Sequence, residues 1–71
     1  MASLTQEDLL RSSVGLAGGS PGQAQDLIIC CKLFAEHYKV KRTAVYQQAT
    51  LSLYKRHTGP QAIAAMKEIL L

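Results

Sequence analysis

The sequence predicts an all-α fold: a single helical domain over residues 1–71, built as a small bundle of three to four helices. Three observations predict it. Apolar side chains recur every three or four positions along most of the chain, which is the period of an amphipathic helix. No segment alternates apolar and polar residues as a half-buried strand does. Two breaks that contain glycine and proline, "AGGSPGQ" and "RHTGP", separate segments of helical length.

The first helix is predicted over about residues 5–15. Ser3 and Thr5 are both candidate N-caps, because each is followed three residues later by a side chain that can complete a capping box. Acidic side chains in the first turn also suit the positive end of the helix dipole. The apolar side of this helix is expected to comprise Leu4, Leu9, Leu10 and Val14.

The second helix is predicted over residues 21–38. Ser20 can cap a helix that opens with proline, and Gln23 stands at the capping-box position. A helical stripe then extends over four turns and comprises Ala24, Leu27, Ile28, Cys31, Phe34, Ala35 and Tyr38.

Further apolar residues, Ile29, Cys30 and Leu33, widen this stripe beyond one face. The helix therefore needs neighbours on two sides, either more of its own chain or a second subunit. Adjacent cysteines rarely bridge each other, so we expect Cys30 and Cys31 to be small buried apolar side chains.

The third and fourth helices are predicted over about residues 42–57 and 60–70. The apolar set of the third comprises Val45, Ala49 and Leu53, with Tyr46 and Leu51 flanking it, and Gly59 would be the left-handed residue that ends the helix. The fourth would open at its proline and carry a plain amphipathic stripe of Ile63, Met66, Ile69 and Leu70.

Positive charge is concentrated in the centre of the chain. Between residues 32 and 56, six basic residues stand against the single acid Glu36, whereas the whole chain has a net charge of +3. A basic block of this kind is the electrostatic footprint of a phosphate-binding surface, although basic segments are also common as plain solvated faces.

The path of the chain between residues 38 and 42 has two interpretations. No glycine or proline forces a turn there, so one unbroken helix from Pro21 to His57, or a plain hairpin of helices, is one alternative. The other is a helix-turn-helix at 31–50, in which the small Ala35 lets the helices touch while Val40 and Val45 fix the angle between them.

The stretch "LFAEHYKVKRTAVYQQ" resembles the helix-turn-helix of bacterial and phage transcriptional regulators over its sixteen residues. Three positions depart from that pattern. Lys39 replaces the turn glycine and would need a left-handed backbone or a different turn. Lys41 replaces the capping serine, although Thr43 could cap one turn later. Gln48 stands where an apolar residue is expected, and Ala49 could serve instead.

The resemblance implies roles for individual residues. Arg42 would bind guanine, Gln47 would bind adenine, and the methyl group of Thr43 would meet a thymine methyl. The implied base-reading residues are Lys41, Arg42, Thr43, Tyr46, Gln47 and Thr50. The implied phosphate contacts are Lys39, Lys55 and Arg56. Each role has a structural alternative: Tyr46 could simply pack, and Lys55 and Arg56 could simply favour a helix C-terminus.

Catalysis is not expected. His37 and His57 are twenty residues apart, with no cysteine or acid at metal-ligand spacing, so neither a metal nor another cofactor is predicted. The glycine-rich "GLAGGSPG" lacks the lysine of a phosphate-binding loop. The start carries acids and no basic leader, and the longest apolar run has five residues, too short for a membrane span. We therefore expect a cytoplasmic protein with no membrane association.

The function favoured by these patterns is a small helical regulator that binds duplex DNA sequence-specifically and controls transcription. It is expected to act as a homodimer, with either the second or the last helix as the seam, because a palindromic site needs two modules. The alternative is a protein-interaction module (an adaptor, chaperone or antagonist) that docks an apolar helix face onto a protein partner.

Overall fold

The computed structural model describes residues 3–70, with the side chain of Leu70 left out. Within this range the chain forms four helices and no strand: α1 (Gln6–Leu16), α2 (Pro21–Tyr38), α3 (Arg42–Tyr54) and α4 (Gly59–Leu70). The predicted all-α bundle is confirmed, and most helix bounds fall within one residue of the expected ones.

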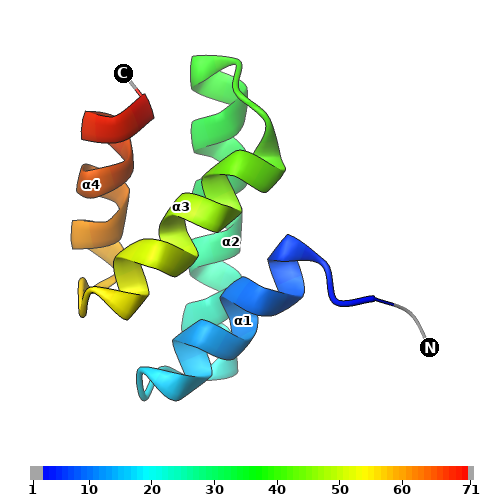
Figure 1. Ribbon diagram of the computed structural model, residues 1–71, viewed down its shortest axis with the longest axis vertical. Coiled ribbons are helices and arrows are strands. Elements are labelled where there is room, and N and C mark those ends of the chain that lie inside the picture. The colour runs from blue at the N-terminus through cyan, green and yellow to red at the C-terminus, as the bar shows by residue number, and fades with distance from the viewer. Residues whose placement is uncertain (1–2, 71) are drawn as a thin grey trace.

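Helix α3 lies at the centre of the bundle. It crosses in front of α2 in Figure 1, with α1 and α4 on either side, and it packs against all three. Helix α2 packs mainly on α1 and α3 and only weakly on α4. Three sides of α3 are therefore held by other helices, and one long side is left uncovered.

The starts of α1 and α2 are fixed by the expected side-chain caps. The Asp8 backbone N–H donates to Thr5 Oγ1 at 3.1 Å, and the Thr5 N–H donates back to the Asp8 carboxylate at 3.2 Å. Ser20 and Gln23 form the same reciprocal pair at 3.2 and 2.7 Å. Of the two candidate caps for α1, Thr5 is the one used.

The core gathers apolar side chains from all four helices. The buried set is Leu10, Val14, Ala24, Leu27, Ile28, Cys31, Phe34, Ala35, Val45, Tyr46, Ala49, Ala62 and Met66. Two members of the expected apolar side of α1, Leu4 and Leu9, are exposed, because Leu4 precedes the helix and Leu9 faces away from α2 and α3.

The two cysteines have different environments. Cys31 is fully buried, and this burial, together with the neighbouring Cys30 thiol, raises its pKa from 9.0 to about 12. Cys30 is exposed, so the expectation that both cysteines are buried is wrong for Cys30. The reason is helical geometry, since neighbouring helix residues point about 100° apart.

The chain turns between α2 and α3, which excludes the unbroken helix. The Val40 N–H donates to the Ala35 carbonyl at 3.0 Å and the Lys39 N–H to the Glu36 carbonyl at 3.4 Å, the two bonds of a Schellman motif. Lys39 takes the left-handed conformation, with φ 54° and ψ 44°. A lysine thus occupies the place where the motif usually has glycine.

Helix α3 then begins without a side-chain cap. Lys41 is its N-cap residue and makes no capping hydrogen bond. The idea that Thr43 caps one turn later is wrong, because Arg42 already has helical backbone and the Val45 N–H bonds to the Lys41 carbonyl at 3.2 Å.

The end of α3 also differs from the prediction. The helix stops at Tyr54 rather than near residue 57, and the left-handed residue is Arg56, with φ 65°, rather than Gly59. A second Schellman pair causes this: the Arg56 N–H donates to Leu53 O at 2.9 Å and the His57 N–H to Ser52 O at 3.1 Å. Gly59 instead opens α4.

Helix α4 packs its predicted stripe only in part. Met66 is fully buried and Ile63 is half-buried, whereas Ile69 is 56% exposed. Ala62, which the stripe omitted, is fully buried and allows α4 to approach α3 closely. Among the described residues, none of the helices combines the length and apolar character that crossing a membrane requires.

Candidate nucleic-acid interface

One side of α3 is open to solvent along the whole helix. The side chains on it, which we call the α3 strip, recur at helical spacing and are Thr43, Gln47, Leu51 and Tyr54. The opposite side buries Val45, Ala49 and Ser52 against the other helices. Since the buried side fixes the rotation of the helix about its own axis, the strip has a defined orientation.

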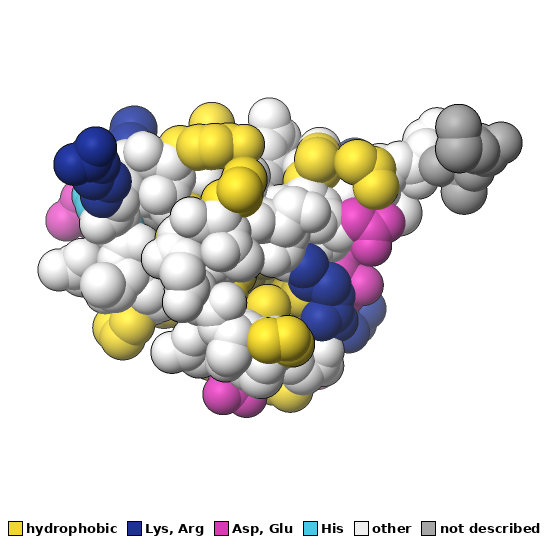
Figure 2. Space-filling model, turned by 90° about the horizontal axis from the view of Figure 1, so that it is seen from below, with side chains coloured by type: hydrophobic (Ala, Val, Ile, Leu, Met, Phe, Trp, Pro, Cys, Tyr) yellow, Lys and Arg dark blue, Asp and Glu magenta, His cyan; other side chains and the backbone are white. Residues whose placement is uncertain are grey.

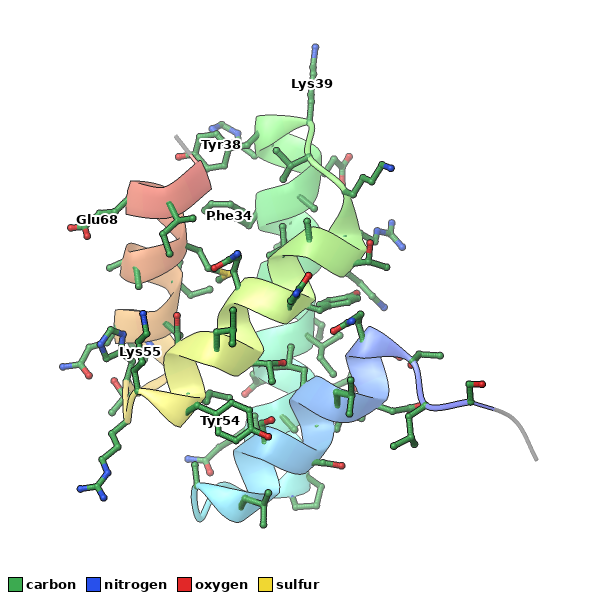
Figure 3. All side chains as sticks on the ribbon, viewed as in Figure 1. Phe34, Tyr38, Lys39, Tyr54, Lys55 and Glu68 are labelled. Atoms are coloured by element: carbon green, nitrogen blue, oxygen red, sulfur yellow. The ribbon has the colours of Figure 1, made fainter. Side chains whose placement is uncertain are left out.

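Basic side chains lie at both ends of this strip. Lys39, Lys41 and Arg42 stand at its beginning, and Lys55 and Arg56 follow its end; all five are exposed. Figure 3 shows Lys39 extending from the upper end and Lys55 at the opposite end. Thirteen helical residues separate the two groups by about 20 Å. The strip is thus an uncharged surface with positive charge at either end.

No acid lies on α3, and the acids of α1 are engaged elsewhere. Glu7 faces Lys32 of α2, with 3.7 Å between carboxylate and ammonium, and the Asp8 carboxylate accepts the bond that caps α1. The charge of Glu7 is therefore offset by Lys32, and the charged side chains at the two ends of α3 itself are all basic.

The implied base-reading role of Tyr46 is wrong for this structure. Its side chain is only 5% exposed and belongs to the core, where burial raises the pKa of its phenol. In this structure the phenol cannot reach a base edge. It packs among α1, α2 and α3 because its position lies on the inner face of α3.

Thr50 is also less available than expected. It is half-buried, and its Oγ1 donates to the Tyr46 carbonyl at 2.9 Å, a bond within the helix. The remaining implied base readers, Lys41, Arg42, Thr43 and Gln47, are all exposed. They share the first two turns of α3 and the residue before it.

Two exposed side chains of the strip were not predicted as functional. Leu51 is exposed, and Tyr54 is 70% exposed. They follow Gln47 by four and seven residues, which places them on the same face of α3. This helical spacing could have been read from the sequence, because Val45 and Ala49 mark the inner face of the helix. They extend the candidate surface toward the end of α3.

A groove lies at the lower end of the molecule, beside the end of α3. It has a volume of about 870 Å³ and runs between the α1–α2 turn and the α3–α4 turn. Figure 2 views the molecule from this end, where apolar side chains are interspersed with charged ones. We call it the end groove. Its apolar lining includes Val14, Leu16, Leu27, Leu53, Tyr54 and Ile63, and its polar lining includes Gln23, Asp26, Arg56 and His57.

His57 stands out in the lining of the end groove. Its Nδ1 atom is buried and has no hydrogen-bond partner among the described residues. Nowhere in the described range do three or more metal-ligating side chains come together, so the imidazole has no companions of that kind.

The chain matches no protein-family model, no curated protein and no solved structure. Its functional assignment therefore depends on the geometry and charge of its own residues.

Proposed function

We propose that this protein is a small helical regulator that binds duplex DNA by laying the α3 strip in the major groove. The observation that carries the proposal is the strip itself: an uncharged helix face, open along its length, with basic residues at both ends. An α-helix fits the major groove, which is about 12 Å wide and presents the donors and acceptors that distinguish base pairs.

The basic residues at the two ends of the strip would contact phosphates and set the position of the helix. A helix about 20 Å long reaches the backbone on both sides of the groove, where Lys39 at one end and Lys55 and Arg56 at the other would neutralise phosphates. Between them, the first two turns would face the bases. Arg42 and Gln47 are the side chains able to bind a base in a bidentate way, and Thr43 can meet a thymine methyl.

The connection between α2 and α3 supports the same proposal. Three residues, 39–41, separate the helices, as expected for a helix-turn-helix. The preceding helix contributes Ala35 and Phe34 to the same core cluster that holds Val45 and Ala49 of α3, so the strip is presented on a packed support.

The test is a fluorescence-anisotropy titration onto mixed-sequence duplex DNA at low and moderate salt. We expect salt-sensitive binding, weakened at least tenfold in the variant Arg42→Ala/Gln47→Ala, because each good base contact contributes about 1–3 kcal/mol. The matched control is Lys67→Ala, which removes a positive charge from the exposed side of α4 and should change affinity little. Absence of binding to any duplex at low salt would reject the proposal.

The second candidate is a protein-interaction module, and one observation favours it. Helix α2 exposes Ile29 and Leu33 on the side away from the core, and neither is covered in the chain. Apolar docking would be nearly insensitive to salt, so the same titration series with a protein partner would separate the two candidates.

A further inference from the structure

We propose that the end groove is a homodimer interface, in which two copies of the chain meet about a two-fold axis and insert Tyr54 and Leu16 into each other's groove. Part of the argument rests on the proposed DNA binding, namely the part concerning the direction in which the two α3 strips face. The remainder rests on the surface alone.

The surface has the self-complementary form that a two-fold interface requires. Leu16 and Tyr54 are the two most exposed large apolar side chains of the described residues, at 82% and 70%. Both border the end groove, whose floor is formed by the apolar Leu27, Leu53 and Ile63. In a two-fold interface the same patch serves both copies, so a patch that carries projecting apolar side chains beside an apolar hollow can pair with itself.

The charges around the groove fit the same arrangement. Asp26 on α2 and Arg56 after α3 both line it, and neither forms an ion pair within the described residues. A two-fold axis allows Asp26 of each copy to face Arg56 of the other, which gives two equivalent ion pairs. These pairs would also offset the repulsion between the two basic ends of α3 that the axis brings near each other. In the dimer Tyr54 and Arg56 therefore belong to the interface, and Lys39 and Lys55 remain as the phosphate contacts at the two ends of α3.

The position of the groove gives a geometry suited to DNA. The molecule measures 31 Å and 28 Å along the two axes in the plane of Figure 1, and the groove lies at the lower end of that view. With the two-fold axis along the line of sight, both α3 strips face the same side of the dimer, as binding to successive major grooves on one side of a duplex requires.

Neither of the dimer seams expected from the sequence, on the second or on the last helix, would place both α3 strips on one side of the dimer. The exposed apolar residues of α2, Ile29 and Leu33, lie on the side of that helix opposite α3. A dimer through that side would place the two α3 strips on opposite faces, where they could not bind one duplex. In α4, Met66 is already fully buried within the chain and is unavailable to a partner.

The test is sedimentation equilibrium without DNA, from micromolar to submillimolar protein. We expect wild type to approach twice the chain mass and Tyr54→Glu to dissociate, with a Kd raised at least about tenfold, because a buried tyrosine at the centre of an interface is a typical hot spot. The matched control, Leu33→Glu on the far side of α2, should remain dimeric. A monomeric wild type would overturn the proposal, and so would a dimer that Leu33→Glu dissociates or that Tyr54→Glu leaves intact.

Charge reversal tests the pairing directly. Asp26→Arg should weaken the dimer, and Asp26→Arg/Arg56→Asp should restore it. If the double variant dimerises more weakly than the single variant, Asp26 of one copy does not face Arg56 of the other. Circular dichroism of every variant checks that the helices persist. The outcome is separable from that of the DNA proposal through Leu16→Glu, a variant on α1 and outside the α3 strip, which should dissociate the dimer and still bind a duplex weakly through one α3 strip. A stable dimer that binds no DNA would reject the function and retain the interface.

Discussion

Lys39 occupies a backbone conformation that normally selects glycine. Its φ of 54° lies in the left-handed region, which a side chain with a Cβ enters at a cost of about 1–2 kcal/mol. The turn requires this conformation because the N–H groups of Lys39 and Val40 both return to carbonyls of α2. The lysine therefore costs the fold some stability relative to glycine, and it places a positive charge at the beginning of the α3 strip.

Replacing this lysine by glycine should stabilise the fold. We expect Lys39→Gly to raise the free energy of unfolding, measured in urea, by about 0.5–1 kcal/mol. Glycine relieves the backbone strain in the folded state, and the greater conformational freedom of glycine in the unfolded chain offsets part of this gain. Lys39→Ala removes the charge and keeps the strain, so it should show no comparable gain. Equal stability of the glycine and alanine variants would contradict this account of the turn.

At the scale of the elements, α4 is held to the bundle by few side chains. It packs on α3 through Ala62 and Met66, both fully buried, and its contact with α2 is slight. In chains of this size, here 71 residues, a single hydrophobic core rarely supplies more than about 3–5 kcal/mol of stability. The attachment of α4 is therefore a large fraction of what keeps the fold together.

Truncation of Met66 should reveal this dependence. Met66→Ala removes a fully buried side chain and is expected to cost about 2–5 kcal/mol, enough to melt most of the domain in a thermal scan followed by circular dichroism. Ile69→Ala, on the same helix but more than half exposed, should cost less than about 1 kcal/mol. Similar melting curves for the two variants would mean that α4 is not part of the cooperative core.

At the scale of the whole molecule, the uneven distribution of charge matters more than the net charge. The net charge is only +3. On α1, Asp8 is engaged in the cap of that helix, and Glu7 forms an ion pair with Lys32 of α2. The basic residues at the two ends of α3 dominate the face that the strip presents. A polyanion should therefore be attracted to this face rather than to the molecule as a whole.

Salt dependence can measure the number of phosphate contacts. In a plot of log affinity for duplex DNA against log salt concentration, Lys55→Ala should reduce the slope by about one unit, because one fewer phosphate is neutralised. It should weaken binding to all sequences about equally, since phosphate contacts do not read bases. Lys67→Ala should leave the slope unchanged. A slope that falls equally in both variants would indicate attraction to net charge instead of a defined surface.

The sequence by itself determined the features that arise from neighbouring residues. Helical periodicity, the capping pairs Thr5–Asp8 and Ser20–Gln23, and the glycine–proline breaks are local, and the structure has them as predicted. The helix ends that rely on a strained residue were harder to predict. Arg56 has no sequence signature of a left-handed turn, whereas the nearby Gly59 has one, so the prediction placed the end of α3 too late.

Only the tertiary structure decided which faces of the helices are used. Tyr46 and Gln47 are adjacent and both suit a DNA surface, yet one is in the core and the other is exposed, because the packing of α1, α2 and α4 fixes the rotation of α3. The end groove likewise joins residues from four helices and two turns that no local pattern relates. Local periodicity sets where helices form, whereas burial against other helices, which is non-local and depends on their relative orientation, selects the residues that remain for function.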